Sequence, residues 1–134
     1  MSAGETNLRD LIQTMSPLLD DAEWIFATIN VEDEASLAPY AIASFREAEG
    51  LTLVLPLPAS GDLESVSAPM KRIILEVHSS LEVVGLTAAV AGALAKEGIS
   101  ANVIAAYYHD HIFVPKTSAD RALALLQALS TSTG

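Results

Sequence analysis

The sequence contains no cysteine, few basic residues and few aromatic residues. Without cysteine the chain cannot form a disulfide, offer a thiolate to a metal or use a cysteine nucleophile. Seven Lys and Arg residues stand against 17 Asp and Glu residues, and the formal net charge is −10. Such a charge repels phosphate backbones and anionic lipids, so we expect neither nucleic acid nor membrane as a partner. With only 5% aromatic residues, the core should be aliphatic.

Long apolar runs are also absent, although 51% of the residues are hydrophobic. Residues 83–95 form the longest nearly uncharged run, which is shorter than the roughly 20 residues that span a bilayer. No basic segment followed by an apolar core opens the chain, so we expect no signal peptide and a cytoplasmic location. The mean hydropathy of +0.38 is high for a soluble monomer, and we therefore expect a homodimer.

The first half of the chain is predicted to be rich in strands. An asparagine cap and helical spacing of leucines predict a short helix over residues 7–15. Asp20 and Asp21 indicate a turn, and Glu49-Gly50 is typical of a hairpin turn. The expected strands cover residues 23–31, 40–46 and 51–57, with an acidic connection over 32–38 and a loop over 58–70.

The second half is predicted to alternate strands and helices. A strand over 72–78 leads into a helix that ends near Gly98, then two strands within 99–115 and a helix within 118–129. This order suits an α+β, ferredoxin-like βαββαβ unit that lacks its last strand. Because an open sheet edge is a liability, we expect a strand from residues 23–57 or a second subunit to fill it.

Three segments resemble a known family: FREAEGLTLVLP (45–56), the long run from IILEVH to HIFVP (73–115) and the closing helix with ALLQAL. Together they resemble ACT-like domains, in particular small bacterial proteins with a degenerate tandem of them. The resemblance implies two ferredoxin-like halves packed together, a degenerate one over 1–69 and a second over 70–134. It also implies a regulatory role in which an amino acid or similar small molecule binds at an interface. Since no enzyme is attached here, the regulated protein would be a separate partner, or the chain would act alone as a sensor.

The first candidate site is the strand-to-helix turn formed by Ser79, Ser80, Val84, Gly85 and Leu86. The resemblance implies that this glycine-containing turn offers backbone amides to a ligand carboxylate. Unsatisfied N–H groups at a helix N-terminus attract anions, and glycine permits close approach. The alternative is structural: Ser79 or Ser80 caps the helix, and Gly85 is a packing contact.

The second candidate site is the entry to the following strand, with Ile99, Ser100, Asn102 and Val103. The resemblance implies that this region faces the first turn across a dimer interface. Ser100 and Asn102 then contact the ammonium or carboxylate of a ligand. Their alternative role is ordinary turn chemistry after a helix end.

The third candidate is the group His109, Asp110 and His111. Two histidines spaced by two lie on one face of an extended strand, and His78 could add a third imidazole to a metal site. A turn expected within 108–111 would break that spacing. The alternatives for Asp110 are a structural role, accepting backbone N–H bonds and orienting a histidine, and a ligand contact. We expect no metal and no cofactor, with the three histidines as the alternative.

No motif of catalysis is present, neither a nucleophile elbow, a zinc-protease helix, a phosphate-binding loop nor a dinucleotide fingerprint. We therefore expect no enzyme. The sequence predicts a stand-alone regulatory protein that binds a small molecule, an amino acid in particular. The alternatives are a protein-interaction module without ligand and a histidine-based metal-binding protein.

Overall fold

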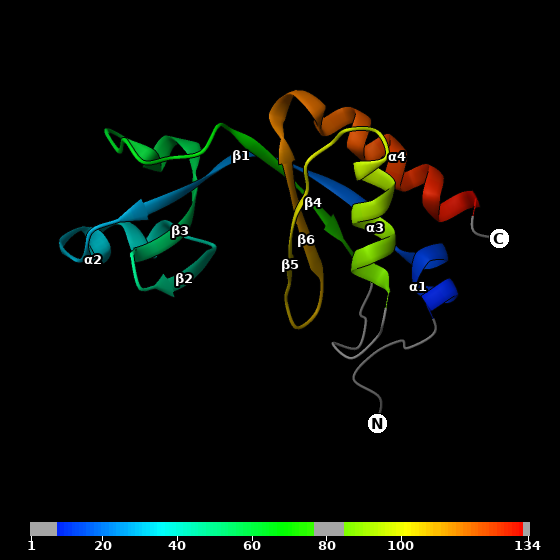
Figure 1. Ribbon diagram of the computed structural model, residues 1–134, viewed down its shortest axis with the longest axis horizontal. Coiled ribbons are helices and arrows are strands. Elements are labelled where there is room, and N and C mark those ends of the chain that lie inside the picture. The colour runs from blue at the N-terminus through cyan, green and yellow to red at the C-terminus, as the bar shows by residue number, and fades with distance from the viewer. Residues whose placement is uncertain (1–7, 77–84, 133–134) are drawn as a thin grey trace. The chain divides into compact units, whose positions relative to one another are not determined.

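The long strand β1 (Pro17–Ile29) contributes to two compact units of the chain. The computed structural model describes residues 8–76 and 85–132 (Figure 1). The terminal unit comprises Met1–Asp21 and Lys71–Gly134, and the central unit comprises Ala22–Met70. The first residues of β1 therefore pack with the C-terminal half of the sequence. The halves predicted over 1–69 and 70–134 are a division by family pattern rather than by packing, and they stay a prediction.

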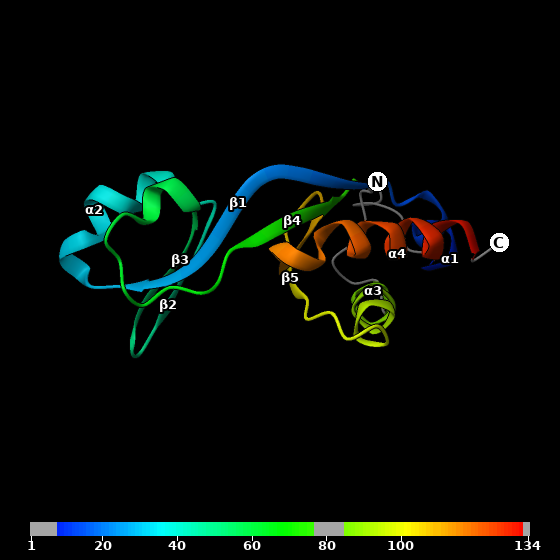
Figure 2. The ribbon, with the colours of Figure 1, turned by 90° about the horizontal axis from the view of Figure 1, so that it is seen from above.

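The terminal unit has a ferredoxin-like plan. Its strands are β4 (Met70–Leu75), β5 (Asn102–Ala105) and β6 (Asp110–Pro115), and its helices are α1 (Leu8–Thr14), α3 (Leu86–Ala95) and α4 (Ala119–Ser132). The strand order is β1-β4-β6-β5. The position of a fourth ferredoxin strand is thus taken by the start of β1, a strand from the first half of the chain. In both views α1, α3 and α4 lie on the same side of β4, β5 and β6 (Figures 1 and 2).

Helix α3 buries one stripe of side chains and is followed by a glycine that caps its C-terminal end. Leu86, Val90 and Leu94 recur every fourth residue and are all at most 3% exposed, as the helical period requires. Gly98 has φ +75° and donates to the carbonyl of Ala95, while the N–H of Ile99 donates to Leu94. This pair of hydrogen bonds is a Schellman cap, so the predicted helix end at Gly98 is confirmed.

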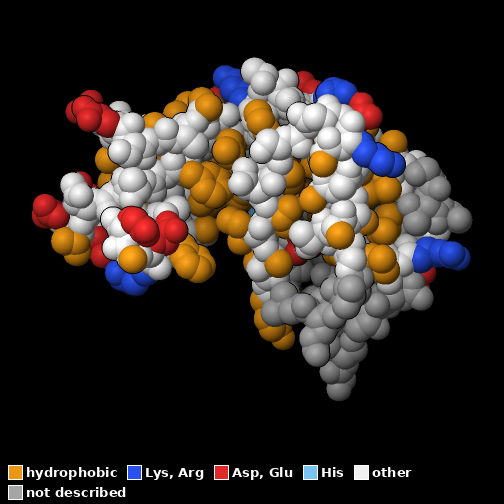
Figure 3. Space-filling view, viewed as in Figure 1, with side chains coloured by type: hydrophobic (Ala, Val, Ile, Leu, Met, Phe, Trp, Pro, Cys, Tyr) orange, Lys and Arg blue, Asp and Glu red, His pale blue; other side chains and the backbone are white. Residues whose placement is uncertain are grey.

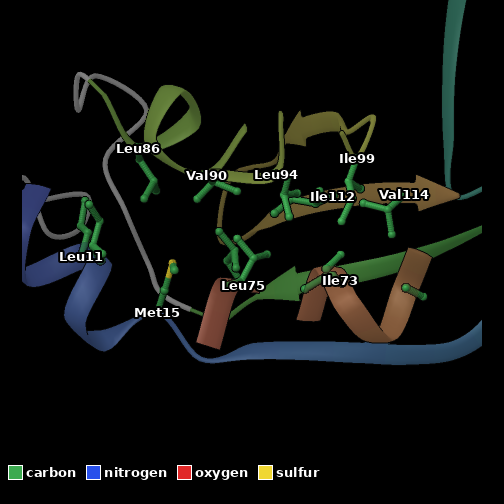
Figure 4. Close-up of a cluster of buried hydrophobic side chains, with 14 residues drawn as sticks. Leu11, Met15, Ile73, Leu75, Leu86, Val90, Leu94, Ile99, Ile112 and Val114 are labelled. Atoms are coloured by element: carbon green, nitrogen blue, oxygen red, sulfur yellow. The ribbon is translucent and has the colours of Figure 1, made fainter. Parts of the chain in front are cut away.

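In the core of the terminal unit, side chains of α1 pack with side chains of α3, α4, β4 and β6 (Figure 4). Leu11 of α1 and Met15, directly after this helix, face the α3 stripe (Figure 4), and both are at most 3% exposed. Strands β4 and β6 contribute the buried side chains of the sheet to this core. The buried cluster comprises Leu11, Ile12, Met15, Ile73, Leu75, Leu86, Val90, Leu94, Ile99, Ile112, Val114, Ala119, Ala122 and Leu126. As predicted, this core is aliphatic.

The central unit is an antiparallel sheet of β1, β3 (Gly50–Pro56) and β2 (Ala43–Glu47), in the order β2-β3-β1. Between β1 and β2 the chain forms only the four-residue helix α2 (Glu34–Leu37) and two short 3-10 turns. A separate core of Ile25, Ala27, Ile29, Leu51, Leu53 and Leu55 lies on one face of this sheet. The short α2 agrees with the degenerate pattern predicted for the first half.

The fold class is as predicted, α+β and ferredoxin-like, but several boundaries differ from the prediction: β1 ends at Ile29 rather than at residue 31, and β4 begins at Met70 rather than at residue 72. Strand β1 continues through Asp20 and Asp21, where a turn was expected, because Arg72 on β4 pairs with Asp20 at 2.9 Å. Strand β2 begins at Ala43 rather than at residue 40, since residues 38–40 form a 3-10 turn that contains a proline. The hairpin loop is Ala48-Glu49, one residue earlier than expected. None of the helices in the described ranges is both long and apolar enough to cross a membrane.

Candidate functional site

The strand-to-helix turn is described only from Gly85 onward; Ser79, Ser80 and Val84, like His78, lie outside the described residues. Gly85 precedes α3 with φ +102°, a conformation that L side chains rarely adopt. A Cβ placed on it would lie 3.0 Å from Cδ2 of Leu8. Leu86 is 3% exposed and belongs to the core. The backbone conformation at position 85 therefore favours glycine, and the ligand contact of the amides that follow it stays a prediction.

The second predicted group lies at the opposite end of α3. Ile99 is buried directly after the helix, Ser100 and Asn102 are exposed, and Val103 is half-buried against the core. Helix α3 has ten residues and is thus about 15 Å long. Within one chain this length separates Gly85 from Ser100, so one small ligand cannot contact both.

The hairpin between β5 and β6 turns at Tyr107-Tyr108, slightly earlier than the predicted 108–111. Ala105 pairs with Asp110, and the N–H of Ala106 donates to the carbonyl of His109 at 3.0 Å. The two tyrosines are more than 60% exposed and meet edge to face, with ring centroids 5.0 Å apart. This turn lies at the end of the terminal unit where α3 begins (Figure 1). Asp110 therefore shares an end with Gly85.

Burial shifts the pKa values of two side chains at the start of β6. Asp110 is 8% exposed, and burial raises its pKa above the usual 3.8, although His109 opposes the shift. For His111, burial lowers the pKa below 6.5, and the guanidinium of Arg72 and then His109 lower it further. Arg72 Nη1 lies 3.5 Å from His111 Nδ1 and also donates through Nε and Nη2 to Asp20. A positive group at this position disfavours both a protonated His111 and a metal on it.

His109, the other histidine of this hairpin, has a buried ring nitrogen. His109 Nδ1 is buried and has no hydrogen-bond partner within the described structure. Over residues 8–76 and 85–132, no group of three His, Cys, Asp or Glu side chains is placed to hold a metal ion. The three-histidine alternative depends on His78 and stays a prediction.

Sequence reasoning missed two cavities in the central unit. The first, here called the hairpin cavity, has a volume of about 280 Å³. Its lining residues are Ile29, Asn30, Val31, Glu34, Arg46, Glu47, Glu49, Gly50 and Leu51. A second cavity of about 330 Å³ shares Ile29, Asn30 and Glu49 with it and adds Asp33, Asp62 and Glu64. The sequence feature that could have indicated these cavities is the acidic connection over 32–38 together with the glutamates of the hairpin. In the sequence alone these side chains are typical of ordinary solvated charges.

Models of the ACT domain match residues 68–128 and 3–62. A crystal structure of a Vibrio cholerae protein of unknown function, described as a possible transport protein, is 52% identical, with a TM-score of 0.80, and the match covers 92% of this chain and 95% of that one. A protein from Agrobacterium tumefaciens is 15% identical, with a TM-score of 0.70 over 87% of this chain and 89% of its own. The ligand-free regulatory subunit of aspartate kinase from Thermus thermophilus is 10% identical, with a TM-score of 0.63 over 87% and 97%. No curated protein matches.

Proposed function

Because this chain belongs to the ACT-domain family, with one domain matched in each half, we propose that it is a stand-alone regulatory protein that binds an amino acid and has no catalytic activity of its own. The ligand sits between two copies of the chain. The turn at Gly85 of one copy and residues Ser100 to Val103 of the other form its walls. The regulated protein is a separate partner.

The observation that carries this proposal is the position of these groups at opposite ends of α3. A length of about 15 Å keeps them apart in one chain, whereas two copies in antiparallel contact would place one group beside the other. Ser100 and Asn102 are exposed and thus accessible to a second copy. The net charge of −10 opposes pairing, so a ligand that bridges the copies would favour the dimer.

The chemistry on each side fits an amino acid. The first turn of α3 contains no acidic residue, and its N–H groups carry partial positive charge that favours a carboxylate. The hydroxyl of Ser100 and the amide oxygen of Asn102 accept hydrogen bonds from an ammonium group. Since the ligand contacts both copies, it stabilises the paired state by its differential affinity for that state.

A thermal-shift screen tests this function. The purified protein is heated with each of the twenty amino acids, with organic acids and nucleotides, and with divalent metals with and without chelator. At a hundred times its dissociation constant, a ligand stabilises the native state by about 2.7 kcal/mol, which raises the midpoint by several degrees. We expect a selective rise with one or two amino acids, and sedimentation should show a larger dimer fraction under the same conditions.

The matched variants are Ser100→Trp, which fills the site, and Gln127→Trp, which places the same bulk on an exposed position of α4. Neither position is buried, so both variants should fold. The ligand-induced shift should disappear in Ser100→Trp and persist in Gln127→Trp. A screen without any amino-acid response, or an equal response in both variants, would refute the proposal.

A further inference from the structure

Strand β2 lies at an edge of the central unit's sheet, because it begins the order β2-β3-β1. It is joined to β3 by the two-residue loop Ala48-Glu49, with Glu47 paired to Gly50. In such a hairpin the pair next to the loop exchanges both backbone hydrogen bonds, and the bonded pairs then alternate along the strands. The N–H and C=O groups of Ser44 and Arg46 consequently point away from β3. They form an edge to which a further strand can pair.

The side chains of this edge are exposed and partly apolar. The last four residues of β2 are all exposed, and Phe45 is 71% exposed. Tyr40 and Ile42, immediately before β2, are 60% and 44% exposed. Tyr40 also lines an apolar groove with Pro56, Pro58 and Ala59. A strand that pairs with β2 would cover this apolar surface.

The net charge of the central unit indicates the charge of a strand that could bind at the edge of β2. Residues 22–70 contain eight acidic side chains and one arginine, a formal charge of −7, and thus hold most of the charge of the chain. Acidic side chains are prominent on the part of the surface formed by α2, β2 and β3 (Figure 3). The single arginine, Arg46, is paired with Glu34 at 2.9 Å. A second copy would bring the same charge to the edge, and the repulsion disfavours it as the occupant.

We propose that β2 binds an extended, basic segment of a partner protein, which adds to the sheet as a further strand. Its backbone pairs with Ser44 and Arg46, and its apolar side chains cover Phe45. A lysine or arginine at the end of the segment enters the hairpin cavity beside Glu47 and Glu49. Main-chain hydrogen bonds give the affinity, and the glutamates select for positive charge. This interaction does not depend on the amino-acid site proposed above.

A defined peptide tests the proposal. The probe is a fluorescent peptide of about eight residues, the length of an ordinary strand, in which lysine and valine alternate. A control peptide has the same composition with the lysines in one block. A second control carries N-methyl groups on alternate residues and cannot pair along one edge. Polarisation measurements should show tighter binding of the alternating peptide than of either control, and weaker binding at high salt.

Ser44→Pro removes an N–H that points away from β3, so it blocks the added strand and leaves the β2–β3 ladder intact. Loss of the backbone bonds at this position should weaken peptide binding about tenfold or more. Ser44→Thr, which keeps the N–H, should bind as the wild type does. Thermal unfolding of both variants checks that the fold is retained.

A charge-reversing pair gives a second, independent measurement. Glu49→Lys lies at the hairpin cavity, and Asp120→Lys makes the same change of net charge on α4 in the other unit. Peptide binding should weaken more in Glu49→Lys. Equal binding by wild type and Ser44→Pro, or by alternating and block peptides, would reduce the interaction to unspecific charge attraction and overturn the proposal. A dimer that dissociates on Ser44→Pro would identify a second copy as the occupant and overturn it as well.

Discussion

Replacement of Gly85 by alanine is the sharpest test of how the candidate turn is built. The backbone at this residue has φ +102°, and a non-glycine residue held in such a sparsely populated region costs about 1–3 kcal/mol. A second cost comes from the new methyl group, which would lie 3.0 Å from Cδ2 of Leu8. That atom ends a flexible side chain and can move by a few tenths of an ångström. The cost of the backbone conformation should therefore exceed the cost of the contact with Leu8.

The assay is denaturant unfolding of four proteins: wild type, Gly85→Ala, Leu8→Ala and the double variant. Gly85→Ala should lower the free energy of unfolding by about 1–3 kcal/mol, which corresponds to several degrees in the midpoint. Leu8→Ala removes the steric contact, so the double-variant cycle measures that contact alone. The coupling energy should be smaller than the loss in Gly85→Ala. Wild-type stability in Gly85→Ala, or full rescue by Leu8→Ala, would refute the assignment of the cost to the backbone.

This result also decides how the ligand site is tested. A loss of ligand response in Gly85→Ala could follow from lower stability, since the new side chain would be strained by the backbone conformation and would crowd Leu8 of α1. Ser100→Trp avoids this difficulty because Ser100 is exposed.

Three further predictions concern the terminal unit. Leu11→Ala should lower the free energy of unfolding by about 2–5 kcal/mol, because Leu11 is fully buried among residues of the C-terminal half; a loss below about 1 kcal/mol would mean that α1 is not part of that core. Arg72→Met should cost about 1–3 kcal/mol in denaturant unfolding, because it removes the ion pair at 2.9 Å between the partly buried side chains of Arg72 and Asp20, and Lys96→Met, which changes an exposed cation by the same charge, should cost little. The pKa of His111 is lowered in the folded state, so the unfolded chain binds the proton first and stability should fall as the pH drops below 6.5. The slope of the unfolding free energy against pH should decrease in His111→Gln. Asp110, whose pKa is raised above 3.8, makes the folded state more stable as the pH falls and so acts in the opposite direction. An unchanged slope in His111→Gln would assign the effect to other groups.

Local patterns predicted most elements of the terminal unit. The stripe of Leu86, Val90 and Leu94 and the glycine at 98 define α3 through interactions within ten or so residues, and such interactions can be recognised from spacing. The same applies to α4 and to the β5–β6 hairpin, although its turn falls at Tyr107-Tyr108. In one case a distant residue overrode the local signal: the acidic pair Asp20-Asp21 is typical of a turn, but Arg72 pairs with Asp20 and the strand continues through both residues.

The candidate sites were predictable as residues but not as an arrangement. The sequence indicated the glycine turn and the Ser100–Asn102 entry at the two ends of one predicted helix, and the structure adds the length of α3, ten residues or about 15 Å, which keeps them apart within one chain. The sequence could not show that Glu47 and Glu49 line a cavity, because the cavity arises where the end of β1 and the β2–β3 hairpin meet.

The sequence by itself determined the fold class, the aliphatic core, the acidic character and the ACT-type pattern of both halves. These follow from composition and from short-range periodicity, which each segment carries within itself. Only the tertiary structure decided which strand completes the terminal unit, since pairing of β1 with β4 joins residues far apart in the chain and depends on their mutual burial. Only the tertiary structure left β2 as an edge in the acidic unit, because an edge is defined by the strands that do not pair with it.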